Sequence, residues 1–184
     1  VYTNDIVTAT VSASDPDGDP LTYTWRWYVD SGNGAALVAT NSGSGISDTL
    51  DGVFHFDKDD SVYVEVDAAD SSATDTMTSS SITILNTPPT AFNVLIAPAS
   101  PVAGLDDLVC TFQDADADGD SVSISYAWEV DGVSTTYSTD TIPASDTADG
   151  EVWECIITPN DGTDDGSTAS ATVTIGANAE GATG

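Results

Sequence analysis

The chain has 184 residues, and 31 Asp and Glu against 2 Lys and Arg give it a formal net charge of −29. Nucleic acids and anionic membranes would repel such a surface, because both are bound through clustered Lys and Arg, whereas divalent cations would be attracted. No apolar run approaches the ~20 residues of a membrane-spanning helix, so neither nucleic-acid binding nor membrane insertion is expected. The acidity is equally suited to solubility or high salt, so charge alone does not identify an ion.

The first half of the chain predicts short strands joined by polar turns. Thr, Val, Ser, Asp and Gly are abundant, while the helix formers Glu, Lys and Leu are scarce. Apolar residues at alternate positions indicate four strands: Val7, Ala9 and Val11; Tyr23, Trp25 and Trp27; Val62, Val64 and Val66; and Ile82 and Ile84. No strand is predicted ahead of Val7.

The second half predicts a complete set of strands. Residues 86–90 (Asn-Thr-Pro-Pro-Thr) form a short, stiff spacer because of their two prolines. Seven short strands follow, near residues 92–96, 108–112, 122–130, 133–137, 139–142, 153–157 and 171–175. This spacing favours a sandwich of two sheets. The expected domains are 1–86 and 87–175, followed by a C-terminal tail, 176–184.

The two halves are related by duplication. Residues 15–30 can be laid over residues 116–131 without a gap. Each segment is an Asp-x-Asp-Gly-Asp loop that leads into an alternating strand with an inward Trp. A repeat of this length indicates a duplicated domain, so we expect an all-β chain of two tandem sandwiches, the first lacking strand A.

The two cysteines are expected to form a disulfide. Cys110 and Cys155 fall in the middle of two predicted strands and face inward, where a bond would join the two sheets. Ala9 and Val64 occupy the matching positions of the first half. The alternative is a pair of buried free thiols. A disulfide would place the protein outside a reducing cytosol.

Several motifs resemble tandem PKD-like, or bacterial immunoglobulin-like and cadherin-like, repeats. These are the two Asp loops, the Trp of the following strand, the Val-Trp-Glu-Cys run at 152–155 with Pro-Asn-Asp-Gly at 159–162, and the Asn-Thr-Pro-Pro linker. The resemblance implies immunoglobulin-like β-sandwiches of a secreted or surface-anchored microbial protein. Expected partners are neighbouring repeats or identical subunits, with a cell-surface or carbohydrate ligand as a further candidate.

The Asp loops are candidate calcium sites. Closely spaced carboxylates supply the hard oxygen ligands that Ca²⁺ requires, and a fourth acid from another loop at the same end of the sandwich would join each triplet. An ordinary polar turn is the alternative. The expected ligands are Asp15, Asp17, Asp19 and Asp70 in the first half and Asp116, Asp118, Asp120 and Asp161 in the second.

No pattern indicates catalysis. His55, the single histidine, is expected on an exposed strand, and Lys58 is expected in a solvated turn. The preferred interpretation is a non-enzymatic, extracellular, calcium-stiffened structural or adhesive module. One alternative is an accessory binding or spacer module of a secreted hydrolase.

The missing first strand suggests a further alternative. A sandwich without strand A exposes an unpaired edge, which another subunit could fill, as in donor-strand filaments. The competing explanation is that the chain is a section of a longer repeat array.

Overall fold

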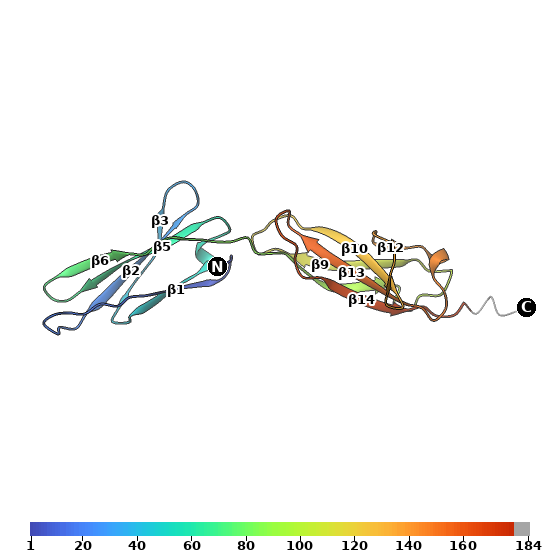
Figure 1. Cartoon of the computed structure of the whole chain (residues 1–184), viewed down its shortest axis with the longest axis horizontal. Helices are drawn as coiled ribbons and strands as arrows, with labels where there is room; N and C mark the ends of the chain where they lie inside the picture. The colour runs from blue at the N-terminus through green and yellow to red at the C-terminus, as the bar shows by residue number, and fades with distance from the viewer. Residues whose placement is uncertain (179–184) are drawn as a thin grey trace, which may run out of the picture. The chain divides into compact units, whose positions relative to one another are not determined.

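A computed structural model describes residues 1–178, and the chain divides between Thr87 and Pro88 into two compact units (Figure 1). Unit 1 comprises the residues up to Thr87, and unit 2 begins at Pro88. Most of the expected tail, residues 179–184, lies outside the described part. No helix within residues 1–178 is long and apolar enough to cross a membrane.

Unit 1 is a sandwich of a two-stranded and a five-stranded antiparallel sheet. The small sheet pairs β1 with β4, and the large one has the order β3-β2-β5-β6, with β7 also on β5. The elements are β1 (Ile6–Thr10), β2 (Thr22–Asp30), β3 (Ala36–Gly43), β4 (Ser47–Asp51), α1 (Gly52–His55), β5 (Ser61–Ala69), β6 (Thr74–Thr78) and β7 (Ile82–Thr83). The inward residues of β2 and β5, among them Trp25, Trp27 and Val64, form the core.

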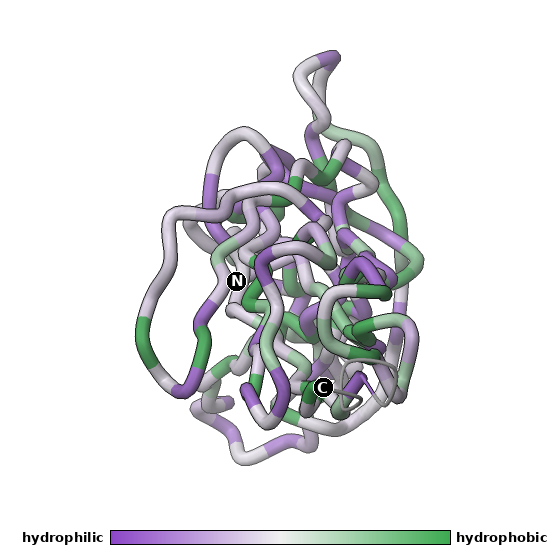
Figure 2. Tube along the Cα trace, turned by 90° about the vertical axis from the view of Figure 1, so that its right-hand side faces the viewer, coloured by the Kyte–Doolittle hydropathy of each residue, from purple (hydrophilic) through white to green (hydrophobic). Residues whose placement is uncertain are grey.

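Unit 2 is a sandwich of a four-stranded sheet, β11-β10-β13-β14, and a three-stranded sheet, β12-β9-β8. Its elements are β8 (Thr90–Ala97), β9 (Leu108–Ala115), β10 (Ser123–Val130), β11 (Val133–Ser134), β12 (Thr141–Ile142), a 3-10 turn (Ala144–Asp146), β13 (Val152–Asn160) and β14 (Ala169–Thr174). Trp128 and Trp153 pack edge to face in its core, with ring centroids 6.3 Å apart. Hydrophobic positions are interspersed with hydrophilic ones along the trace (Figure 2).

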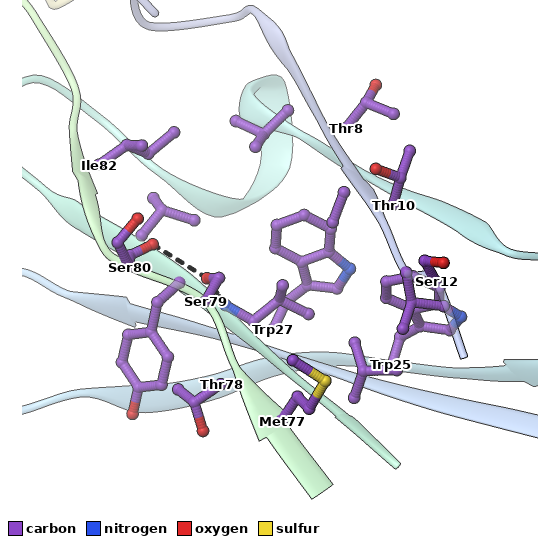
Figure 3. A pocket seen from close by; sticks show the side chains of 17 residues that line it. Thr8, Thr10, Ser12, Trp25, Trp27, Met77, Thr78, Ser79, Ser80 and Ile82 are labelled. Carbon is purple, nitrogen blue, oxygen red and sulfur yellow. Dashed lines mark hydrogen bonds between the residues drawn. The ribbon is translucent and has the colours of Figure 1, made fainter. Parts of the chain in front are cut away.

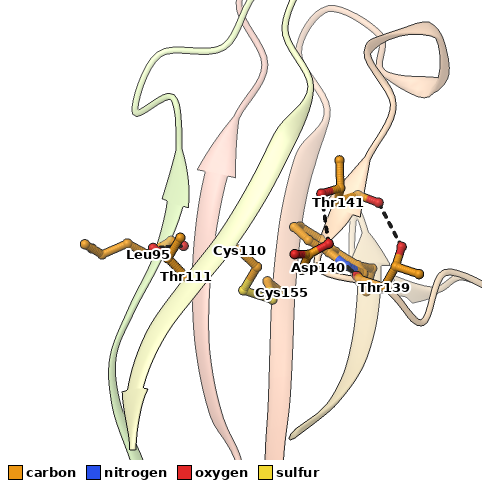
Figure 4. The surroundings of a disulfide bond; sticks show 8 residues. Leu95, Cys110, Thr111, Thr139, Asp140, Thr141 and Cys155 are labelled. Carbon is orange, nitrogen blue, oxygen red and sulfur yellow. Dashed lines mark hydrogen bonds between the residues drawn. A yellow bond between two sulfur atoms is a disulfide. The ribbon is translucent and has the colours of Figure 1, made fainter.

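The expected disulfide is present. Cys110 of β9 is bonded to Cys155 of β13, so the bond joins the two sheets of unit 2 across its core (Figure 4). Both cysteines are at most 3 % exposed. Since both cysteines belong to the buried core, the bond ties the two sheets together from inside the sandwich.

One local expectation was wrong, and a second was right only in part. His55 ends the short helix α1 instead of lying on a strand, because Asp51 caps the helix by accepting a hydrogen bond from the Val53 N–H. Lys58 lies in a turn as expected, but it is half-buried rather than solvated, and its Nζ donates to Asn86 Oδ1 over 3.2 Å.

Unit 1 lacks the strand that opens unit 2, as expected. In unit 2, β8 pairs along β9 and packs against β14. In unit 1, β1 is paired along β4 alone within the described residues. The parallel bridge from Tyr2 to Leu85 has a counterpart from Val102 to Gly176. The first residues of unit 1 therefore correspond to those that follow β8, and β8 itself has no counterpart.

Candidate metal centres

Each Asp-x-Asp-Gly-Asp loop is held by its first aspartate. Asp15 Oδ1 accepts hydrogen bonds from the N–H groups of Asp17 and Asp19, over 2.9 and 3.0 Å. In unit 2, Asp116 Oδ1 accepts from Asp118 and Asp120 over 2.8 and 3.1 Å. The glycine of each loop turns the chain at positive φ, +80° at Gly18 and +76° at Gly119, which a residue with a Cβ rarely adopts. The two loops thus share one conformation.

That conformation does not by itself imply an ion. Asp30 Oδ1 accepts from the N–H groups of Gly32 and Gly34, both over 2.9 Å, in a hairpin loop with the same pattern. The Asp30 loop belongs to neither group of converging carboxylates. What distinguishes the two Asp loops is therefore the number of acids that meet at them.

Three carboxylates converge at each loop. Their oxygens lie within 4.8 Å of one another, in the groups Asp15, Asp19 and Asp70 in unit 1 and Asp116, Asp118 and Asp120 in unit 2. Two oxygens on opposite sides of one Ca²⁺ are about 4.6–5.2 Å apart, because each Ca–O distance is about 2.3–2.6 Å. The spacing of the oxygens therefore fits a shared calcium ion in each unit.

The two groups differ in their third member. Asp70, from the loop between β5 and β6, joins the unit 1 group, while Asp17 lies outside it. Asp161, at the matching position of unit 2, lies outside the unit 2 group, which Asp118 completes instead. The β13–β14 loop covers residues 161–168 and the β5–β6 loop only residues 70–73, so Asp161 stands on a much longer loop.

Asp70 is ionised and positioned by its own loop. Its Oδ1 accepts hydrogen bonds from the N–H groups of Ser72 and Ala73, over 2.7 and 2.6 Å. These backbone hydrogen bonds lower the pKa of Asp70. The carboxylate is thus held in the charged form that a cation requires.

The unit 2 group is partly withdrawn from water. All three of its residues are half-buried, and Asp116 Oδ2 is buried without a hydrogen-bond donor among the described residues. A buried carboxylate oxygen without a donor is costly. A hard cation is one species that would satisfy it, as would a donor such as water, so the donor set of unit 2 is compatible with Ca²⁺.

No family model and no curated protein matches this chain. Among solved structures, the N-terminal four Ig domains of Dscam1 isoform 4.44 align over 96 % of this chain and 42 % of that one, with 14 % identity and a TM-score of 0.36. The FN1–FN3 domains of chicken CNTN1 align over 96 % and 64 %, with 13 % identity and a TM-score of 0.41. At such values the likeness carries no argument about function. The tandem immunoglobulin-like sandwich rests on the sheets described above.

Proposed function

We propose that this chain is a non-catalytic, extracellular structural or adhesive module whose two sandwiches are stiffened by calcium. The observation that carries the proposal is the convergence of three carboxylates at the same loop of both duplicated units. A site that serves a shared function of a duplicated module is expected in both copies, and each copy assembles its acids here.

The physical role of the ion is to offset repulsion between like charges. Three carboxylates within 4.8 Å repel one another unless a cation lies between them, and a half-buried position weakens the screening by water. In unit 2 the loop follows Ala115, which pairs with Thr90, the first residue of β8. An ion held there would stiffen the segment by which the chain enters unit 2 from its Pro-Pro linker.

The extracellular assignment is supported by the disulfide, because such bonds persist outside a reducing cytosol. The large negative charge suits contact with divalent cations and with neighbouring repeats that they bridge. Identical subunits, and a cell-surface or carbohydrate ligand, belong to the same proposal as partners.

Thermal unfolding with and without Ca²⁺ tests the proposal. Excess Ca²⁺ should raise the melting temperature, since an ion that binds the folded loops and not the unfolded chain stabilises by mass action. Ca²⁺ titration calorimetry should give two sites, and Asp116→Asn should remove the unit 2 site. Asp30→Asn, in the loop without converging acids, is the matched control. Equal melting temperatures in Ca²⁺ and in chelator, at the same ionic strength, would exclude calcium.

A second candidate is favoured by a different observation. Within residues 1–178, unit 1 contains no counterpart of β8 and the outer edge of β1 is unpaired, an arrangement that resembles an acceptor in donor-strand assemblies. Such a subunit would be joined to a neighbour by the strand that fills it. An accessory binding or spacer module of a secreted hydrolase is a variant of the first candidate, because such a module would also use the two calcium-stiffened sandwiches as a rigid spacer.

A further inference from the structure

The outer face of the large sheet of unit 1 carries an aromatic pair. Tyr28 of β2 lies opposite Tyr63 of β5, and their rings stack with centroids 4.9 Å apart and planes 8° from parallel. Because Trp27 and Val29 belong to the core, Tyr28 points to the opposite face of the sheet. Leu37 of β3 lies opposite Tyr28 on its other side and is 52 % exposed. These side chains form an apolar row across three strands.

A hydrogen-bonded polar row lies next to the aromatic pair. Glu65 Oε2 accepts hydrogen bonds from the Tyr28 hydroxyl over 3.1 Å and from Arg26 Nε over 3.5 Å. Arg26 also donates two hydrogen bonds to Asp67, over 2.6 and 2.8 Å. Side chains that are already held by their neighbours lose little conformational entropy when a ligand binds. The row is therefore preorganised for polar contacts.

Polar groups with unused hydrogen-bonding capacity border the pair. Glu65 Oε1 and the Tyr63 hydroxyl make no hydrogen bond with any of residues 1–178. The first is an acceptor, and the second can both donate and accept. On β6, Thr78 points away from Trp25 whereas Met77 points toward it (Figure 3). The hydroxyl residues of β2, β3 and β6 that share the outer face are Thr24, Thr40, Ser42, Thr76 and Thr78.

Unit 2 lacks this arrangement at the matching positions. The overlay of the two units places Glu129 at the position of Tyr28, and Glu154 lies opposite Glu129 as Tyr63 lies opposite Tyr28. Like charges directly opposite each other are unfavourable in a sheet, yet unit 2 forms the same pairing of strands. The sandwich thus does not require the aromatic pair, which points to a role for it other than folding.

Charge and area restrict the ligand of this face. The net charge of −29 repels anionic ligands and a second copy of the chain. A protein interface of standard size needs about 800 Å² on each partner and an apolar centre. Leu37 is the one large apolar side chain of this face, within the described residues, that is more than half exposed. A neutral sugar chain fits better, because its C–H groups pack on aromatic rings and its hydroxyls donate and accept hydrogen bonds.

We propose that the outer face of the β3-β2-β5-β6 sheet binds a neutral polysaccharide across the Tyr28–Tyr63 pair. Sugar rings pack against the two tyrosines and Leu37, and sugar hydroxyls bond to Glu65 Oε1 and the Tyr63 hydroxyl. The strand rises about 13 Å from Tyr28 to Thr24, which exceeds the length of one sugar ring, so the ligand is a chain of sugars. The inference develops the carbohydrate partner named above and is independent of calcium, because these residues lie outside both groups of converging carboxylates.

Native affinity gel electrophoresis of the full chain tests the proposal. The gels contain hydroxyethylcellulose, galactomannan or arabinoxylan as neutral probes, and alginate as an anionic one. At least one neutral polysaccharide should retard the chain relative to a gel without polysaccharide, and alginate should not. The retardation should be the same in Ca²⁺ and in chelator, which separates this site from the candidate metal centres.

Three variants separate binding from stability. The double variant Tyr28→Glu, Tyr63→Glu copies Glu129 and Glu154, which unit 2 tolerates, and it should abolish the retardation. Tyr63→Phe keeps the stacked rings and removes one hydroxyl, so it should weaken binding at least threefold without changing the melting temperature. Phe92→Ala removes an aromatic ring of unit 2 that is 44 % exposed. It is the matched control and should bind like the unaltered chain.

Three results would overturn the proposal, even if calcium binds as proposed. The first is that none of the neutral polysaccharides retards the chain, or that alginate alone does. The second is equal retardation of the double variant and the unaltered chain. The third is self-association of the chain that the double variant abolishes, because a second copy would then be the occupant of this face.

Discussion

Replacing the disulfide by the pair that unit 1 uses should destabilise unit 2 alone. The perturbation is the double variant Cys110→Ala, Cys155→Val, which copies Ala9 and Val64 of the matching positions. The cysteines are separated by 45 residues. Closing a loop of this length lowers the entropy of the unfolded chain by an amount equivalent to about 4 kcal/mol at 25 °C. The side chains that replace the bond are small and apolar, so little packing is lost with it.

The assay is differential scanning calorimetry of the full chain. A loss of 1 kcal/mol lowers the melting temperature of a domain of about 100 residues by about 4–8 °C, so the unit 2 transition should fall by more than 15 °C. The unit 1 transition is the internal reference, because Ala9 and Val64 are unaltered. A fall of less than about 5 °C in the unit 2 transition would refute the entropic argument, and an equal fall in both transitions would show that the units do not unfold separately.

Three further predictions concern single residues. Two hydrogen bonds join Arg26 to Asp67, over 2.6 and 2.8 Å, and with a hydrogen bond from Thr76 they lower the pKa of Asp67 to about 2. The stability that this pair contributes is complete above the unfolded pKa of about 4 and is lost as the pH falls through about 2. In Asp67→Asn the free energy of unfolding should be about 1 kcal/mol lower at neutral pH, a small value because the pair is partly exposed. An acid titration of this variant should lack the loss of stability between these two pH values. Gly166→Ala would place a methyl group against the carbonyl of Pro89, and urea denaturation should show unit 2 destabilised by about 1–3 kcal/mol. Gly43→Ala is the control, because its methyl group would make only an ordinary contact and should cost far less. Trp27→Phe should cost about 2 kcal/mol in the same assay, because the buried indole N–H donates to Asp48 over 2.7 Å; an unchanged midpoint would show that this bond contributes nothing.

The sandwich and its disulfide were predictable because buried strands leave a clear pattern. Trp25, Trp27 and Trp128 face inward at alternate positions, and each is at most 2 % exposed. The strand β6 left no such pattern, since Thr74–Thr78 lies at a sheet edge and all five of its residues are exposed. His55 was misplaced for the opposite reason. The alternation Phe-His-Phe is typical of a strand, but the cap at Asp51 starts a helix turn.

The sequence predicted where the two candidate metal centres lie, but it predicted less well which carboxylates form each of them. Spacing identified both Asp loops, because an Asp two residues before another, with a Gly next to it, favours this turn. It could not fix which carboxylates converge. Asp17 and Asp118 occupy the same loop position, yet only Asp118 joins its group, a difference that residue spacing does not encode. Sequence spacing does not distinguish Asp70 from Asp161 either. The two residues lie on loops of different length, and those lengths are known only when the ends of the flanking strands are known.

The scarcity of basic residues has a practical consequence for proteolysis. Arg26 and Lys58 are the two residues after which trypsin can cut, and both belong to unit 1. Arg26 lies in the middle of β2, paired on both sides with β3 and β5, and Lys58 is half-buried against Asn86. A protease needs an extended, accessible backbone, so cleavage after Arg26 requires β2 to leave its sheet. The rate of tryptic cleavage after Arg26 therefore measures how often unit 1 opens, while unit 2 holds no residue after which the enzyme can cut.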